Sequence, residues 1–279
     1  MTQATYDRQR VGVFSLISEE HVQMLMEYLN FDQLDARQMS IKVAHAKTCR
    51  WFLNTSGYKN WLDAGEIADH NGLLWIKGKP GAGKSTLMKF LTAHSRKTMR
   101  NAVVVSFFFN ARGEELEKST TVTYRSLLVQ LFEQLPKLKC VLGHLKVPEG
   151  TITSTFHWSV ALLEVLLKHA IQNLGDTSIV CFIDALEECE EDQIRAMISF
   201  FERVGSHCTM VGRDFSSCFA SRHYPPIYAE KAIELVLEGH EGHEQDIASY
   251  LNTQLKIGKT KRAEQIRSRV LEKASGVFM

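Results

Sequence analysis

The chain has 279 residues, of which 44% are hydrophobic and 23% are charged, and its formal net charge is +1. This composition is typical of a soluble globular protein, and the near-neutral charge gives no general reason to expect a nucleic-acid or acidic-membrane partner. No apolar run approaches the ~18 residues of a transmembrane helix, so we expect no membrane segment and a cytoplasmic protein.

The N-terminal part is expected to be helical. Val13–Asn30 carries apolar residues at amphipathic spacing, Phe31–Ser40 has the composition of a linker, and Ile41–Leu53 is a second helix candidate with aromatic residues at its end. Such an aromatic cluster is more typical of core packing than of a ligand site. We therefore expect a helical N-terminal segment or linker over residues 1–65.

A glycine-rich run lies between an expected strand and an expected helix. Leu73–Lys77 is apolar and follows the turn pair Asn71-Gly72, which favours a buried strand. The run that follows fits G-x-x-x-x-G-K-S/T, the phosphate-binding loop. Its residues are Gly78, Lys79, Pro80, Gly81, Ala82, Gly83, Lys84, Ser85 and Thr86. Apolar residues then recur at helical spacing, so the motif has the context that it requires.

The chemistry of a bound triphosphate explains these residue types. Glycines let the backbone curl so that successive N–H groups point inward at the phosphates. Lys84 would bring an ammonium group to the β- and γ-phosphates, and Ser85 would offer a hydroxyl group to Mg²⁺. The helix that begins here would add the positive end of its dipole. The run therefore predicts a nucleotide site.

Strands alternate with helices through the middle of the chain. Five apolar runs are expected to be strands, and the segments between them have helical periodicity. The expected strands are Leu73–Lys77, Ala102–Phe109, Ser178–Ile183, Phe215–Ala220 and Ala232–Leu237. The expected helices between them include Thr120–Leu135, Trp158–Asn173, and Asp192–Val204 followed by Gly205. This alternation predicts a doubly wound α/β domain over residues 66–238.

Acidic residues follow the third expected strand. A carboxylate at the carboxyl end of a strand in an open α/β sheet can hold Mg²⁺, so Asp184 is the metal candidate together with Ser85. Glu187 and Glu188 follow, and either could polarise an attacking water as a general base; we place Glu188 first. The alternative is that these acids only favour the start of the next helix.

The fourth expected strand ends in Arg222 and His223 before a double proline. Arg222 would lie on the same edge of the sheet as the phosphate loop and could contact the γ-phosphate, which would distinguish triphosphate from diphosphate. The alternative is that Arg222 pairs with Asp184 or Glu187 and holds the loops together. Arg112 and Glu114, after the second strand, are treated as loop residues of this edge.

Residues 239–279 are expected to begin a helical extension. Gln245–Leu255 and Ala263–Lys273 have helical patterns, and the chain then stops on apolar residues, which suggests a truncated piece of a longer protein. Asp35–Ser40 and Pro225 are weak candidates for the face that recognises a purine base, and the pattern leaves ATP and GTP both open.

Several motifs taken together resemble one family. They are Leu74–Thr86, Ser106–Gly113, Asp184–Glu188, Ala220–Pro225 and Gly242–Ile247, with weaker likeness at Leu34–Arg37 and Ala44–Cys49. This ordered set looks like the NACHT-type signalling NTPases of filamentous fungi, also described as nephrocystin-3-like P-loop domains. The phosphate loop alone is not specific to this family.

The resemblance implies a P-loop fold of the additional-strand type, with a five-stranded parallel sheet in the order 5-1-4-3-2. It implies that Lys84 and Ser85 contact phosphate and Mg²⁺, that Asp184 is the Mg²⁺ acid, that Glu188 ends the acidic motif and that Arg222 lies in the sensor strand. It also implies a slowly hydrolysing ATP or GTP switch, in which nucleotide state controls homo-oligomerisation of a longer protein that carries a repeat array.

Two positions depart from the family pattern, and other functions stay open. The family usually has aspartate where Glu187 stands and often has glycine where Ala185 stands, so the hydrolysis rate is not fixed by the resemblance. A small-molecule phosphotransferase is one alternative, although no arginine-rich lid segment is evident. A scaffold that binds nucleotide without hydrolysing it is another. A nucleic-acid-stimulated motor is disfavoured by the near-neutral charge.

Overall fold

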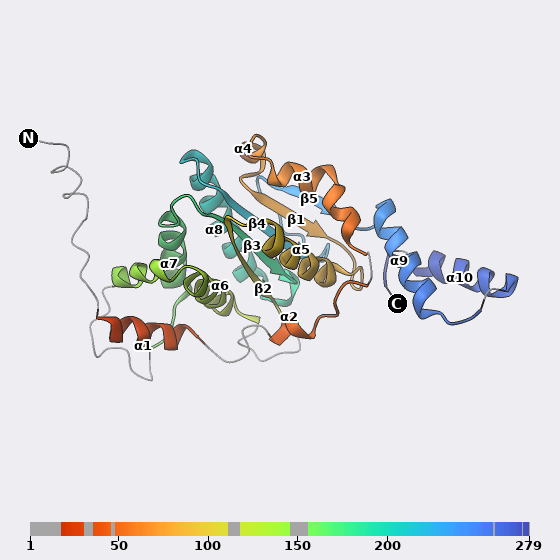
Figure 1. Cartoon of the computed structure of the whole chain (residues 1–279), viewed down its shortest axis with the longest axis horizontal. Helices are drawn as coiled ribbons and strands as arrows, with labels where there is room; N and C mark the ends of the chain where they lie inside the picture. Colours follow the sequence, from red (N-terminus) through yellow and green to blue (C-terminus); the bar gives the residue numbers. More distant parts are fainter. Residues whose placement is uncertain are drawn as a thin grey trace, which may run out of the picture. The chain divides into compact units, whose positions relative to one another are not determined.

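A five-stranded sheet, in which all strands are parallel, carries the site. The computed structural model describes residues 18–30, 36–45, 48–110, 118–145, 156–258, 260–274 and 276–278. The strands are β1 (Leu73–Lys77), β2 (Ala102–Phe108), β3 (Ser178–Asp184), β4 (Phe215–Ser221) and β5 (Ile233–Val236). Their order is β2-β3-β4-β1-β5, with every neighbouring pair parallel (Figure 1). This is the expected order 5-1-4-3-2, so the predicted fold class is confirmed.

Contacts divide the chain into two compact units. Residues 1–34 and 124–175 form one unit, and residues 35–123 and 176–279 form the other, which contains the whole sheet. The division into segments 1–65, 66–238 and 239–279 stays a prediction. None of the helices in the described parts of the chain is long and apolar enough to cross a membrane.

The first unit is helical. It contains α1 (Glu19–Leu29), most of α6 (Thr120–Gln134), a 3₁₀ helix over Pro136–Leu145, and α7 (Val160–Gln172). The last turn of α1 has no basic residue of its own. Arg125 supplies one, because its guanidinium group donates to the carbonyl groups of Tyr28, Leu29 and Asn30 at 2.9, 3.0 and 3.1 Å. The orphan carbonyl groups at the end of α1 are therefore satisfied by a cation.

Helices of the second unit pack on the sheet. α5 (Lys84–Thr98) contacts β2, β3 and β4, and α3 (Ser56–Leu62) contacts β1 and β5. On the opposite face of the sheet, Trp75 and Phe219 meet ring to edge, and Phe201 of α8 (Glu191–Met210) packs on Phe219. Because both faces are covered, β1, β2, β3 and β4 are each buried at all but one position.

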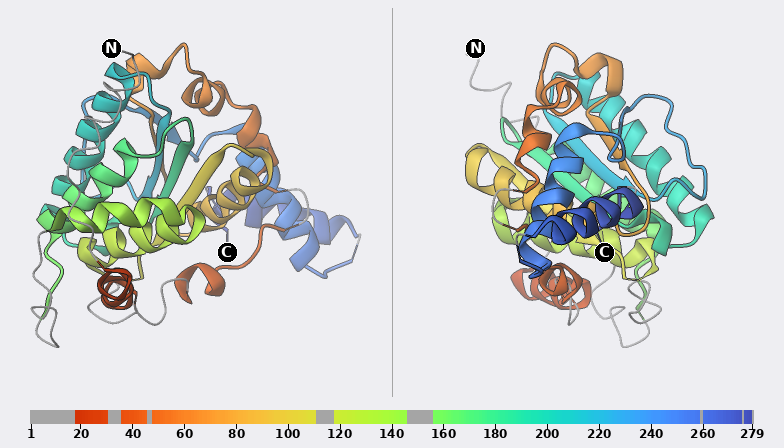
Figure 2. Two further views of the ribbon diagram at one scale, coloured as in Figure 1. Left: turned by 60° about the vertical axis from the view of Figure 1, so that its left-hand side comes forward. Right: turned by 90° about the vertical axis from the view of Figure 1, so that its right-hand side faces the viewer.

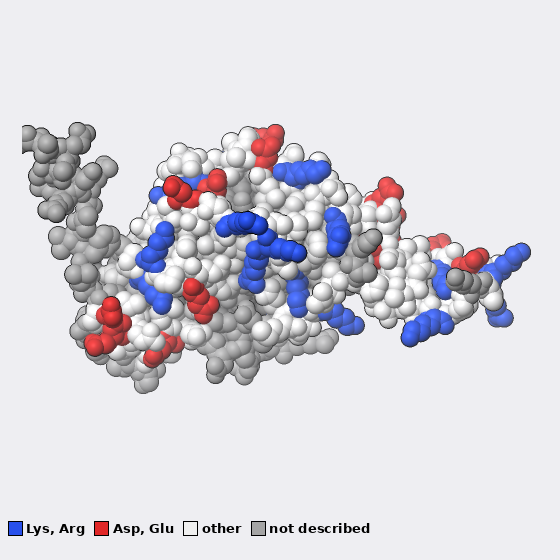
Figure 3. All heavy atoms as spheres, viewed as in Figure 1, with Lys and Arg blue, Asp and Glu red and all other residues white. Residues whose placement is uncertain are grey.

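α5 carries exposed basic side chains in its last turn, although Lys84 at its start is buried. Its last turn carries Arg96 and Lys97, which complement the partial negative charge of the helix C-terminus. Figure 3 shows lysine and arginine side chains gathered over the region in which α5 lies. This gives the expected solvated, charged face of a surface helix.

The expected helix over Ile41–Leu53 is wrong. Ile41 to His45 is not helical, and only Arg50–Asn54 forms a turn of 3₁₀ helix. Cys49 has φ 70°, in the left-handed region, so a continuous helix cannot pass through it. Asp246 of α9 (Glu241–Gln254) fixes this turn, because its Oδ2 accepts from Cys49 N at 2.6 Å and from Trp51 Nε1 at 2.9 Å.

The helix after the acidic run is longer than the sequence indicates. α8 continues past Gly205 to Met210, although we expected it to end near that glycine. A Cβ atom at Gly205 would lie 2.2 Å from the carbonyl oxygen of Asn71, the C-cap of α4 (Ile67–His70). Gly205 is therefore required by the close approach of another backbone and does not end the helix.

The remaining helices are short or C-terminal. α2 (Ala36–Ser40) lies in the segment that we expected to be a linker. α9 and α10 (Lys261–Ala274) pack side by side through Ile247, Leu251 and Ala274, as expected for a helical extension (Figure 2). The expected start of the first helix, at Val13, lies outside the described residues. The same is true of the candidate residues Asp35, Arg112 and Glu114.

Candidate functional site

A cavity of about 400 Å³ lies at the carboxyl ends of β1, β3 and β4. Every residue of the predicted phosphate loop from Pro80 to Thr86 lines it, together with the predicted Asp184, Glu187, Glu188 and Arg222. The carboxyl edge of a parallel sheet is the usual place for a ligand in this architecture. The chain fold thus brings together three groups of residues that are far apart in the sequence.

The phosphate loop holds its lysine in place. Gly81 and Gly83 have φ angles of 79° and 84°, so both positions favour glycine. The Lys84 side chain is buried, and its Nζ donates to Gly78 O at 2.6 Å and to Lys79 O at 3.0 Å. Gly78 and Lys79 therefore support the lysine and do not line the cavity. Burial lowers the pKa of Lys84, against the opposing effect of Glu187 and Asp184.

Asp184 has a carboxylate oxygen that no described protein group satisfies. The residue ends β3 and is 1% exposed, and its Oδ1 has no hydrogen-bond partner in the described part of the chain. Burial raises the pKa of Asp184 to about 7, although a hydrogen bond with the Ser85 side chain lowers it in part. A buried, unpartnered carboxylate oxygen beside a serine hydroxyl is a suitable pair of oxygen ligands for Mg²⁺.

A sharp turn after β3 directs two acids toward the cavity. Ala185 has φ 59°, and Leu186–Glu188 then forms a single turn of 3₁₀ helix. The left-handed region is the conformation that glycine adopts most readily, so an alanine at this position carries backbone strain. Because of this turn, Glu187 and Glu188 both line the cavity beside Asp184.

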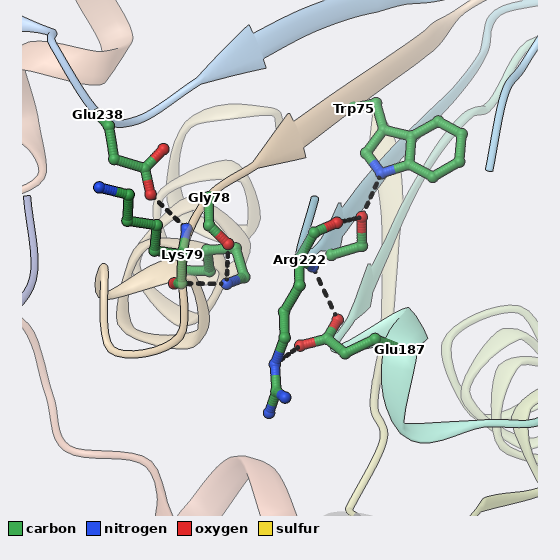
Figure 4. Close-up of polar contacts among 8 residues, drawn as sticks. Trp75, Gly78, Lys79, Glu187, Arg222 and Glu238 are labelled. Atoms are coloured by element: carbon green, nitrogen blue, oxygen red, sulfur yellow. Dashed lines mark hydrogen bonds and ion pairs between the residues drawn. The ribbon is translucent and has the colours of Figure 1, made fainter. Parts of the chain in front are cut away.

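Arg222 is held by Glu187. Its Nε lies 2.9 Å from Glu187 Oε1, and its main-chain N–H donates to Glu187 Oε2 at 3.1 Å (Figure 4). The Glu187 side chain is 8% exposed and the Arg222 side chain is 46% exposed. The ion pair is the alternative that we kept open for Arg222, and the residue also lines the cavity. In Figure 4 the two terminal nitrogens of the guanidinium group lie beyond Nε, on the side away from Glu187.

The strand that ends at Arg222 is tied to the strand that precedes the loop. Trp75 Nε1 of β1 donates to Ser221 Oγ at 2.9 Å, and Ser221 Oγ donates to the carbonyl oxygen of Arg222 at 2.9 Å (Figure 4). Gly78 N, at the start of the loop, donates to Ser221 O at 3.2 Å. The loop and Arg222 are therefore fixed relative to each other by adjacent strands.

Sequence reasoning missed the opposite wall of the cavity. The C-terminal segment lies against the loop: Phe278 N donates to Gly81 O at 2.9 Å, and His243 Nε2 contacts Ala82 O at 2.9 Å. Trp51 and Tyr250 also line this wall. The apolar end of the chain was a visible signal, but nothing in it indicated contact with a loop almost two hundred residues earlier.

The structure distinguishes between the residues that we considered for recognition of the purine base. Arg37, from the range Asp35–Ser40, lines the cavity, whereas Pro225 is not one of the described residues that line it. His223 contacts Glu238 with its Nε2 at 3.2 Å from Oε2. Glu238, the partner of His223, is not among the site residues that we expected from the sequence.

Comparisons with known proteins agree with the resemblance. The family model described as nephrocystin 3, N-terminal, matches residues 47–222. The vegetative incompatibility protein HET-E-1 of Podospora anserina is 28% identical over 147 residues, which are 51% of this chain and 10% of that protein. The chain thus spans about a tenth of the length of this curated relative. The matched family region contains the loop, Asp184 and Arg222, and ends before His223.

Solved structures give weaker likenesses. The Cdc6p protein of Pyrobaculum aerophilum is 13% identical with a TM-score of 0.44, over 83% of this chain and 53% of that one. A Walker-type ATPase of Pyrococcus abyssi is 11% identical with a TM-score of 0.43, over 84% and 66% of the two chains. The strand order of the sheet, and not these scores, establishes the fold. The family match and the loop together support a nucleotide-binding NTPase module.

Proposed function

Because this chain belongs to the nephrocystin 3 N-terminal family, we propose that its cavity binds a nucleoside triphosphate, ATP or GTP, together with Mg²⁺. The observation that carries the proposal is the Oδ1 atom of Asp184, which has no partner among the described residues and belongs to a buried residue that lines the same cavity as Ser85 and the phosphate loop. A fully buried carboxylate oxygen without a partner is costly, unless a cation binds there in the working protein.

The phosphates are bound by the loop from Pro80 to Thr86 and by Lys84. The N-terminus of α5 adds its partial positive charge, since the helix begins at Lys84 within the motif. Ser85 and Asp184 are the residues that hold Mg²⁺, which neutralises charge on the phosphate oxygens when it is bound. An ammonium, a helix N-terminus and a cation site in one cavity favour a highly charged anion over a neutral ligand.

Slow hydrolysis of the triphosphate is the reaction that we propose. Glu188, which lines the cavity, is the acid that accepts a proton from the attacking water, whereas Glu187 binds Arg222. The water oxygen bonds to the γ-phosphorus, the bond from that phosphorus to the bridging oxygen breaks, and the diphosphate leaves. Arg222 contacts the γ-phosphate through its remaining guanidinium donors and so distinguishes triphosphate from diphosphate.

The biological role that we propose is a signalling switch. The relative that bears the name vegetative incompatibility protein supports a role in recognition rather than in metabolism. In a longer protein, nucleotide state would control self-association of the module. Phe278 and His243 bind the outer carbonyl groups of the phosphate loop, which gives the C-terminal helices a direct contact through which to sense the loop.

Magnesium dependence tests the proposal. Calorimetric titration with ATP and with GTP is carried out in Mg²⁺ and in EDTA, for the wild-type chain, for Asp184→Asn and for the control Asp192→Asn. Asp192 is an exposed acid in the first turn of α8. We expect Asp184→Asn to weaken binding in Mg²⁺ about tenfold or more and to leave binding in EDTA nearly unchanged. Equal losses in both conditions would assign Asp184 a structural role.

A further inference from the structure

One peptide unit of the phosphate loop is held from both sides. Gly78 O accepts from Lys84 Nζ at 2.6 Å, and the N–H group of Lys79 donates to Glu238 Oε1 (Figure 4). The carbonyl group of Gly78 and the N–H group of Lys79 belong to the same planar peptide bond, and in the trans form they point in opposite directions. The orientation of this plane therefore links Glu238 to the ammonium group of Lys84.

Glu238 is placed for this contact by the end of β5 and by a glycine. It follows β5 by two residues, and its side chain is 15% exposed. Its Oε2 lies 3.2 Å from His223 Nε2, so both carboxylate oxygens have partners. A Cβ atom at Gly78 would lie 3.3 Å from Oε1, so the absence of a side chain there lets the carboxylate approach. Burial would raise the pKa of Glu238, but the Lys79 amide and His223 lower it overall.

We propose that Glu238 is a positioning residue for triphosphate binding, which acts through the Gly78–Lys79 peptide bond on Lys84. The carboxylate fixes the plane of this peptide, and the carbonyl oxygen on the other side then fixes the Lys84 ammonium group at the edge of the cavity. This inference rests on the proposed binding of a triphosphate. Glu238 is not among the described residues that line the cavity, so we place its effect on the loop and not on the ligand itself.

The charge and the hydrogen bond of Glu238 should have opposite effects on triphosphate binding. The negative charge of Glu238 repels a triphosphate, so charge alone would make its removal favourable. Any favourable effect of Glu238 on triphosphate binding must therefore come from its hydrogen bond with the N–H group of Lys79. A neutral side chain of the same length with an acceptor oxygen can also make this bond. A carboxylate also polarises the peptide and strengthens its carbonyl group as an acceptor for Lys84. A glutamine should therefore replace Glu238 better than an aspartate does.

Two substitutions of Glu238 distinguish the effect of side-chain length from the effect of charge. Glu238→Gln keeps the length and an acceptor oxygen, whereas Glu238→Asp keeps the charge but is one methylene group shorter. Glu234→Asp is the matched control, since Glu234 is in β5, the strand that precedes Glu238, and its carboxylate binds Lys77 Nζ of β1 at 2.6 Å. All three chains are titrated with Mg-ATP, and thermal unfolding confirms that each one is folded.

The expected order is decisive. Glu238→Gln should bind Mg-ATP within about threefold of the wild type, and Glu238→Asp should bind about tenfold more weakly, because the hydrogen bond to Lys79 is lost. Glu234→Asp should bind as the wild type does. Binding by Glu238→Asp at the wild-type level would overturn the proposal, and so would equal losses in the glutamine and aspartate variants.

A second measurement needs no ligand. Hydrogen exchange of the Lys79 amide, followed by NMR without nucleotide, should be about tenfold faster in Glu238→Asp than in the wild type and nearly unchanged in Glu238→Gln. Unchanged exchange in Glu238→Asp would show that Glu238 does not hold the loop. Failure of the wild-type chain to bind Mg-ATP would remove the proposed function, whereas the exchange rates would still decide the role of Glu238.

Discussion

The carboxylate of Glu187 contacts Arg222 at two points, the guanidinium Nε at 2.9 Å and the main-chain N–H at 3.1 Å. It thus fixes both the side chain and the backbone of the residue that follows β4. Arg222 is almost half exposed, so the ion pair itself contributes about 1 kcal/mol or less to stability. Its importance lies in where it holds the guanidinium group, at the wall of the cavity beside Asp184 and the phosphate loop.

Arg222→Ala should change the preference between nucleotides. If the guanidinium group contacts the γ-phosphate, its removal weakens ATP binding about tenfold and leaves ADP binding nearly unchanged, since only the triphosphate has that contact. Calorimetric affinities for the two nucleotides, in the wild type and the variant, measure the ratio. A variant with lower thermal stability and an unaltered ATP-to-ADP ratio would assign Arg222 only the structural ion pair with Glu187.

Glu188→Gln should stop hydrolysis and leave binding intact. The amide cannot accept a proton from water, so we expect turnover of ATP to fall roughly a hundredfold or more, with little change in ATP affinity. Glu187→Gln is the comparison, because that acid is already bound to Arg222. Release of inorganic phosphate under single-turnover conditions gives both rates. A larger fall for Glu187→Gln than for Glu188→Gln would reverse the assignment of the base.

The stability of the ligand-free chain should depend on pH through Asp184. Burial raises the pKa of Asp184 from 3.8 to about 7. The folded chain therefore keeps a proton that the unfolded chain releases, so the free energy of unfolding falls as pH rises between these two values. We expect the melting temperature of the wild type, relative to Asp184→Asn, to decrease from pH 4 to pH 7 in EDTA. A difference that stays constant or grows with pH would contradict this assignment.

Gly205→Ala should destabilise the fold, although alanine favours helices. The new Cβ atom would lie 2.2 Å from Asn71 O, and such overpacking costs roughly 1–3 kcal/mol or more. Gly175→Ala is the control, because Gly175 has φ 69° and no atom within 4 Å of the added group, so only backbone strain of about 1 kcal/mol is expected. Urea unfolding measures both. A Gly205→Ala variant more stable than the wild type would show that the helices separate easily.

Local patterns account for what could be predicted from the sequence. The five strands are short apolar runs, and the phosphate loop is a contiguous motif between the first of them and a helix, so neighbouring residues contain the whole signal. Asp184 and Arg222 were found because each follows such a strand. The register of the parallel sheet places both residues at the same edge of the sheet. The candidate site could therefore be predicted from the sequence.

Contacts between distant residues account for what the sequence did not indicate. The turn at Cys49 is fixed by Asp246, which lies 197 residues later, and the helix that periodicity predicts there does not form. Glu238 lies 159 residues after its partner Lys79. Gly205 looked like a helix terminator, but its role depends on the backbone at Asn71. In each case the partner residue is distant in the sequence, so the hydrophobic periodicity of the neighbouring residues contains no information about the contact.

The affinity of Lys84→Ala for Mg-ATP tests the central claim most directly. Lys84 carries the ammonium group that the loop motif directs at the phosphates, and its Nζ is held at the loop by Gly78 O and Lys79 O. Calorimetry should detect Mg-ATP binding to the wild-type chain, and Lys84→Ala should weaken this binding about a hundredfold while its circular dichroism and melting temperature stay near those of the wild type. Binding by a folded Lys84→Ala chain at the wild-type affinity would contradict the account.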